Sequence, residues 1–246
     1  MNQVRPRRQN VTAGEPPHPH LRAATLPEVL VVLIIIVFIA GLLVPTLARG
    51  KGHGGARIKC VNNLKNLGLA LQIFATDNEG QFPWMVPIEK GGSWEELGDT
   101  NRIWRHFQAL SNELSTPMIL LCRSSPQTQT TRFGPRMTND PGHHRQFSHN
   151  NHVSYFLTTG FVEGDAHGIL SGDRNLTRSG QAIRGRIHPA NNNVFGFTKP
   201  GHHAGDGNLL FADGSVQQVS SSKAARVFNT GFAPIGTNPP PTVLIP

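Results

Sequence analysis

The chain has 246 residues and a formal net charge of +8 at pH 7, with 26 glycines, 19 prolines and a single tyrosine. This length leaves room for one domain of modest size with a real core. The basic residues are scattered and are not interleaved with aromatic residues, which argues against nucleic-acid binding. The sequence contains neither Gly-x-Ser-x-Gly nor a phosphate-binding glycine loop, so it indicates no enzyme class.

The main feature of the N-terminal region is an aliphatic stretch from Leu26 to Ala48, in which Glu28 is the only charged residue. A helix of this length spans the roughly 30 Å hydrocarbon core of a bilayer. We therefore predict a transmembrane helix over 24–48, preceded by a basic leader over 1–23. An acid inside such a segment costs about 2.5–3.5 kcal/mol, which makes Glu28 a candidate functional residue.

The residues at the start of this stretch resemble the N-terminal cleavage and methylation signal of type IV prepilins and type II secretion pseudopilins. Thr25–Glu28 matches the family's Thr-Leu-Xaa-Glu sequence. The resemblance implies that a prepilin peptidase cuts the chain between Ala23 and Ala24 and that Ala24 is then methylated. The chain departs from the family at both positions, where Gly and Phe are usual.

In that family the acid of this motif acts in assembly, because the new α-amino group of one subunit neutralises the buried acid of its neighbour. A buried charge is tolerated only when it is paired. The resemblance therefore assigns Glu28 to contacts with other pilin-like subunits and not to catalysis. Two alternatives remain open, an uncleaved signal anchor and a secretory signal cut after Ala48. A secretory signal core is usually only about 7–15 residues long.

The resemblance also places the chain in the bacterial inner membrane as a single-pass protein with its C-terminal head in the periplasm. The basic residues between Arg49 and Lys59 follow the helix closely and are suited to contact anionic membrane lipid. Cys60 and Cys122 would then lie in an oxidising compartment, where a disulfide is permitted. Two separate buried thiols are the alternative.

We expect an α+β fold, in which a long pilin-type helix packs on a small antiparallel sheet. Pro45 and the glycines of Gly50–Gly55 predict a break in the helix, with a glycine-rich neck over 49–55. The head is expected over 56–235, and the Pro-rich segment 236–246 is expected to be disordered.

Within the head, a helix is predicted from about Ala56 to Thr76. Five apolar residues recur there at spacings of three and four and mark its buried face: Cys60, Leu64, Leu67, Leu71 and Phe74. Spaced apolar residues predict a short amphipathic helix over 103–114. Strands are predicted at Met118–Cys122, Val153–Thr158 and Ile169–Leu170. The segment Asn208–Val219 is predicted to form a hairpin, because apolar sequence precedes an Asp-Gly turn and alternation follows it.

A second resemblance lies at this hairpin. His203 is ten positions before Asp213, and with Gly214 this makes a His-x9-Asp-Gly motif. The motif is similar to the C-terminal motif of a pseudopilin-like family of planctomycetes and verrucomicrobia, and Cys60–Ala70 and Leu170–Asn175 also resemble segments of that family. The resemblance implies a structural, non-enzymatic subunit without a cofactor.

Two kinds of metal site are alternatives to this interpretation. His202, His203 and Asp213 could form a metal-binding or hydrolytic site in a membrane-tethered domain. The alternative is that His203 braces the hairpin through a hydrogen bond to Asp213. Major pseudopilins hold calcium in a C-terminal loop, but their ligands do not map one by one onto this chain. Four acids here offer suitable oxygens: Asp165, Asp173, Asp206 and Asp213.

Overall fold

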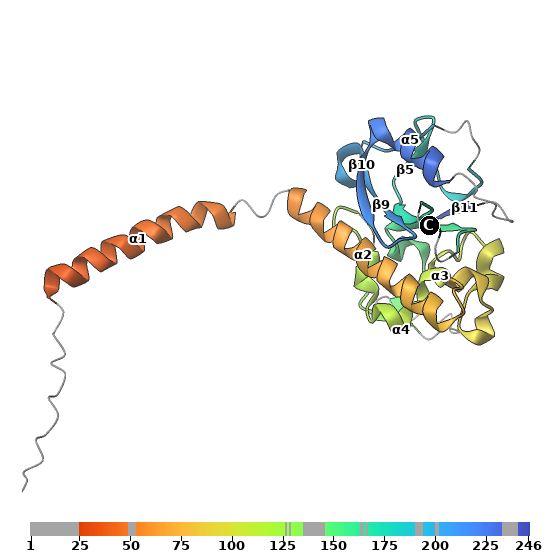
Figure 1. Cartoon of the computed structure of the whole chain (residues 1–246), viewed down its shortest axis with the longest axis horizontal. Helices are drawn as coiled ribbons and strands as arrows, with labels where there is room; N and C mark the ends of the chain where they lie inside the picture. The colour runs from red at the N-terminus through yellow and green to blue at the C-terminus, as the bar shows by residue number, and fades with distance from the viewer. Residues whose placement is uncertain are drawn as a thin grey trace, which may run out of the picture. The chain divides into compact units, whose positions relative to one another are not determined.

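The computed structural model describes residues 25–48, 53–125, 127, 129–134, 146–162, 165, 167–189, 194–199, 202–232 and 241–246. The chain divides into two compact units, Met1–Arg49 and Gly50–Pro246. The first contains helix α1, and the second is a head of helices and antiparallel strands (Figure 1). The α+β class is thus confirmed. The predicted cut site, Ala23 and Ala24, and residues 49–52 of the predicted neck lie outside the described residues.

Helix α1 (Leu26–Ala48) does not break where the sequence predicted. It continues through Pro45, so that prediction is wrong. Pro45 lies three residues before the end of the helix, and the hydrogen bond that it removes leaves the preceding turns in place. The described side chains of α1 end at Ala40. Among the described residues, no helix is long and apolar enough to cross a membrane.

Helix α2 (His53–Asp77) is the helix predicted from Ala56, but it starts earlier. The glycine break is therefore wrong for His53–Gly55. Two helical glycines cost about 1 kcal/mol each, and packing of the helix against the head outweighs that cost. The predicted buried face is confirmed, since all five apolar residues have 4% or less of their surface exposed. Gly80 ends the segment with φ 77° and donates its N–H to Ala75 O at 2.8 Å.

Six strands form one antiparallel sheet in the order β10-β9-β4-β3-β11-β7. Their bounds are β3 (Tyr155–Thr159), β4 (Ile169–Asp173), β7 (Gly185–Ile187), β9 (Asp206–Phe211), β10 (Val216–Ser220) and β11 (Thr242–Ile245). Helix α2 packs on this sheet, and so does α5 (Ser221–Gly231), which the sequence did not predict (Figure 1).

The two helices cover opposite faces of the sheet. A Cβ added to Gly68 of α2 would lie 2.7 Å from Leu210 Cδ1, so this glycine allows α2 to approach β9 closely. On the other face, Phe228 of α5 packs against Phe156 of β3, with ring centroids 6.4 Å apart. Because side chains alternate along a strand, every second residue of β9 points to α2. Asn208, which lies in that register, is buried between the sheet and α2.

The predicted disordered tail is wrong for its last residues. Thr242–Ile245 forms β11 in the interior of the sheet, where Thr242 pairs with Thr159 of β3 and Val243 also pairs with Ile187 of β7. Val243 and the two residues after it are at most 2% exposed. A short apolar run with a β-branched residue at each end is a strand signal, but the neighbouring prolines obscured it.

The remaining strands are short. Sheet β6-β5-β8 is antiparallel, and β1 and β2 pair in parallel. Their bounds are β1 (Arg132–Phe133), β2 (Gln146–Phe147), β5 (Leu176–Arg178), β6 (Gln181–Ala182) and β8 (Phe195–Phe197). The amphipathic helix predicted over 103–114 is present as two short helices, α3 (Trp104–Gln108) and α4 (Ser111–Leu114).

Short 3-10 helices fill much of the segment before β3: η2 (Pro83–Met85), η3 (Ile88–Lys90), η4 (Trp94–Gly98), η5 (Pro117–Leu120) and η6 (Asn150–His152). The strand predicted at Met118–Cys122 is wrong, because η5 occupies most of it. Pro117 suits the first turn of a helix, and the Thr116 hydroxyl accepts from Met118 N at 3.4 Å. The apolar run alone did not distinguish strand from helix.

Helix α3 carries a buried histidine. His106 is 1% exposed, and its Nδ1 lies 2.8 Å from Ser93 Oγ. Burial, with a smaller contribution from the charge of Arg186, lowers the pKa of His106 to about 4. The fold therefore holds the neutral imidazole.

We expect this histidine to make the head less stable in acid. The neutral imidazole of His106 contributes up to about 3 kcal/mol to the free energy of unfolding. This contribution is fully present above the unfolded pKa of about 6.5 and is lost as the pH falls toward 4. Urea unfolding between pH 4 and 8 tests this. His106→Gln should flatten the difference between pH 7 and pH 4.5, whereas His188→Gln, an exposed control, should not. Equal pH dependence in both variants would contradict the assignment.

Candidate functional site

The predicted hairpin is confirmed as β9 and β10, joined by a turn at Asp213 and Gly214. Asp213 Oδ1 accepts from Ser215 N at 2.8 Å, and Gly214 has φ 80°, a region that favours glycine. Both residues of the Asp-Gly motif are therefore occupied in forming the turn.

His203 does not brace this turn. It lies in the 3-10 helix η7 (His202–Gly205), which precedes β9, whereas Asp213 follows that strand. The six residues of β9 separate them by about 20 Å, so a direct hydrogen bond is excluded. The metal set of His202, His203 and Asp213 is not assembled for the same reason. The side chain of His202 lies outside the described residues.

His203 instead faces a buried carboxylate. Asp173, at the end of β4, is completely buried, and its Oδ2 accepts from Asn208 N and Nδ2, each at 2.8 Å. His203 Nε2 lies 3.6 Å from the same oxygen. Asp173 Oδ1 and Asn208 Oδ1 are buried and have no hydrogen-bond partner within the described part of the chain. These three side chains form a closed polar cluster, named here the His203 cluster.

The His203 cluster disfavours charge. Complete burial raises the pKa of Asp173 to about 7, although the hydrogen bonds from Asn208 and the charge of Arg57 offset part of the effect. Burial, followed by the charge of Arg57, lowers the pKa of His203. Because the pKa of Asp173 lies above its unfolded value, ionising this acid lowers stability as the pH rises from about 4 to about 7.

The chain's single tyrosine borders the same cluster. Tyr155 of β3 pairs in register with Asp173 of β4 and is completely buried. Burial raises the pKa of the Tyr155 hydroxyl, and the neighbouring carboxylate raises it further. The hydroxyl therefore stays protonated at physiological pH, and in this form it can act as a hydrogen-bond donor.

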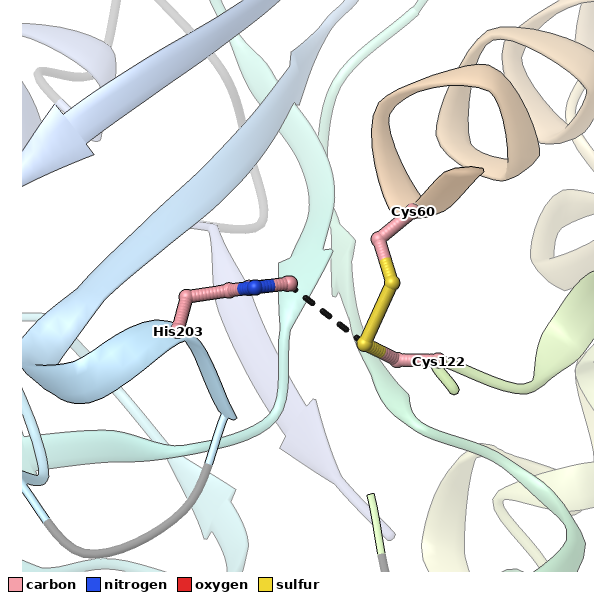
Figure 2. A group of neighbouring side chains, drawn as sticks. All are labelled: Cys60, Cys122 and His203. Carbon is pink, nitrogen blue, oxygen red and sulfur yellow. Dashed lines mark hydrogen bonds between the residues drawn. A yellow bond between two sulfur atoms is a disulfide. The ribbon is translucent and has the colours of Figure 1, made fainter. Parts of the chain in front are cut away.

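A disulfide closes the cluster on the side of α2. Cys60 and Cys122 are bonded, with their Cα atoms 5.3 Å apart, so the pairing that the sequence left open is present. Asn63, one turn further along α2, donates to Leu121 O at 2.9 Å and holds the same segment. His203 Nε2 lies 3.4 Å from Cys122 Sγ (Figure 2).

Arg57 of α2 fixes the position of His203. Its Nη2 donates to the backbone oxygen of His203 at 2.8 Å and pairs with Asp206 Oδ2 at 3.2 Å. His203 has φ 57°, which is costly for a residue with a side chain, and the Arg57 contact compensates for part of that cost. Sequence reasoning missed Arg57. Its position three residues before Cys60, near the predicted buried face of α2, was the available signal.

The four acids considered as calcium ligands do not form a site. Asp173 and Asp213 are engaged as described above. Asp165 Oδ2 accepts from Val162 N at 3.2 Å, and Asp206 pairs with Arg57. Within the described residues, the only group of three close metal-ligand side chains consists of Cys60, Cys122 and His203.

Glu28 lies in the first turn of α1 and is exposed. Its Oε2 accepts from Thr25 N at 3.4 Å, while Thr25 O accepts from Glu28 N at 3.0 Å. An acid three residues after a threonine at the start of a helix is one half of a capping box. Local helix capping is therefore a second role for Glu28 beside the predicted one in assembly.

Comparison with family models, with curated proteins and with solved structures finds no match for this chain. The fold and the two local arrangements, the His203 cluster and the start of α1, therefore carry the functional argument. The first joins η7 to β4 and β9 through buried side chains, and Arg57 links α2 to η7 and β9 beside it. The second presents an apolar helix with one acid at its start.

Proposed function

We propose that the chain is a structural, non-enzymatic pilin-like subunit, anchored in the bacterial inner membrane and assembled through α1 into a type II secretion pseudopilus or a type IV pilus-like filament. The exposure of α1 carries this proposal. Every large apolar side chain from Val29 to Ile39 is between 49% and 69% exposed. A helix that is apolar on all sides needs lipid or other chains to cover it.

The membrane anchor rests on the whole stretch Leu26–Ala48, which is 23 residues long. The portion with described side chains, up to Ala40, would span only about 22 Å at about 1.5 Å per residue, less than the roughly 30 Å of the hydrocarbon core. The apolar sequence continues to Ala48, and the proposal depends on that continuation.

The buried disulfide supports the proposed topology. Disulfides persist outside the cytosol, and one joins Cys60 to Cys122 in the head. A head on the periplasmic side of the inner membrane would meet the required redox condition. The contacts of Arg57, which tie α2 to η7 and β9 beside the buried His203 cluster, support a structural role for the head.

The two roles of Glu28 can be separated by two substitutions. Gln also serves at this position of a capping box, but it cannot neutralise an α-amino group. Assembly through the charge predicts that Glu28→Gln and Glu28→Leu both lose incorporation, by at least about tenfold if the pair contributes 1.4 kcal/mol or more. The measurement is disulfide or chemical crosslinking to other pilin-like subunits in membranes of the native host.

Processing supplies the control for this experiment. The intact mass of each variant should show a chain that begins at Ala24, with or without a methyl group, and cleavage should be lost in a host without prepilin peptidase. Normal incorporation of Glu28→Gln together with loss in Glu28→Leu would assign Glu28 to capping alone. A chain that begins at Met1 or Arg49 would overturn the pilin-like function itself.

A further inference from the structure

The Cys60–Cys122 disulfide and His203 place three metal-ligand atoms together. The two Sγ atoms and one imidazole nitrogen lie within 4.8 Å of one another, and all three residues are buried. They come from α2, from the segment after η5 and from η7, and Figure 2 shows the imidazole directed at Cys122. Two thiolates and an imidazole are a ligand set that suits zinc.

One ligand-to-ligand distance already matches that of a tetrahedral zinc site. Zn–S bonds of about 2.3 Å and Zn–N bonds of about 2.0 Å place a sulfur and a nitrogen ligand about 3.5 Å apart. The distance from His203 Nε2 to Cys122 Sγ is 3.4 Å. A carboxylate oxygen, Asp173 Oδ2, lies 3.6 Å from the same nitrogen. The two sulfurs must separate, to about 3.8 Å, and this requires that their bond be broken.

The surroundings of Cys122 give reagents a route to this half of the disulfide. Cys122 lines a cavity of about 340 Å³. The exposed side chains of Lys59 and Arg123 border this cavity, so it opens to solvent. The thiolate, not the thiol, is the form that binds a metal.

We propose that reduction of the Cys60–Cys122 disulfide converts this group into a zinc site with Cys60, Cys122 and His203 as its protein ligands. In the reducing step a dithiol gives two electrons and two protons to the disulfide. It becomes a disulfide itself and leaves two cysteine thiols. Zinc binding then displaces the two thiol protons. This inference is independent of the pilin-like function, since it concerns the head alone.

Zinc uptake by the purified full chain tests the proposal. The chain is reduced with a phosphine, incubated with zinc chloride and freed of unbound metal, and its zinc content is measured by mass spectrometry. The reduced chain should hold about one zinc, and the oxidised chain none above background. His203→Asn should weaken binding by at least about tenfold, because loss of an outer-shell partner alone already costs about 10–100-fold in metal affinity. His152→Asn, another buried histidine, is the matched control and should bind as the wild type does.

Cobalt(II) provides a spectroscopic readout of the same site. Bound at this site, it should show thiolate-to-cobalt charge-transfer absorption and the visible bands of tetrahedral coordination, and Cys60→Ser should reduce them. Zinc binding of equal strength in the oxidised chain or in His203→Asn would overturn the proposal. So would a reduced chain, folded or unfolded, that takes up no zinc.

Discussion

Val243→Asp is expected to unfold the head. Val243 is completely buried in β11, where it pairs with Thr158 on one side and Ile187 on the other. A carboxylate at this position would have to lose its hydration inside the sheet or be protonated, and either costs several kcal/mol. We expect a loss of at least about 4 kcal/mol, a large part of the 5–15 kcal/mol that stabilises a typical domain.

The chain offers a control with the same chemical change. Val194 is 58% exposed, so Val194→Asp should change the unfolding free energy by about 0.5 kcal/mol or less. Urea unfolding followed by tryptophan fluorescence suits both variants, because the three tryptophans all lie in the head. A Val243→Asp chain with the wild-type midpoint would mean that β11 does not occupy its place in the sheet.

Loss of the disulfide is expected to cost about 4 kcal/mol. The bond joins residues separated by 62 positions, and closing a loop of that size in the unfolded chain accounts for about 4 kcal/mol at 25 °C. Replacing both residues, as Cys60→Ala with Cys122→Ala, should therefore lower the urea midpoint strongly without abolishing the hydrogen bonds that Asn63 and Arg57 make around them.

The reductant supplies the internal check on this second prediction. A phosphine should lower the midpoint of the wild-type chain toward that of the double variant and leave the double variant unchanged. Measurements without added metal keep any stabilisation by zinc out of the comparison. If the reductant leaves the urea midpoint of the wild-type chain unchanged, the cysteines are not bonded in solution or the bond contributes nothing to stability.

The parts of the fold that could be predicted are those set by local patterns. The buried face of α2 follows from apolar spacing, and the β9–β10 hairpin follows from Asp213-Gly214, since only a few turn types fit that dipeptide. Cys60 and Cys122 could be recognised as candidates for pairing. Their actual pairing depended on how η5 lies against α2, which no local pattern specifies.

Three of the misses share a different cause, because each was decided by contacts distant in sequence. β11 forms a strand because it inserts between β3 and β7. The prolines before it led to the prediction of disorder. Asp173 was singled out as an oxygen ligand for calcium, yet its neighbour Asn208 lies 35 positions away and makes it a buried acid. The link between His203 and Asp213 was predicted from a motif in sequence, and a six-residue strand separates them in space.

The place of β11 also constrains when the head can form during biosynthesis. Among the strands that the structure describes it comes last in sequence, yet it lies in the interior of the sheet between β3 and β7. As the chain emerges from the ribosome or crosses a membrane, β3 and β7 are therefore made before β11. Each keeps an unpaired edge until β11 inserts between them. Such edges recruit other strands, so the head is most exposed to aggregation during that interval.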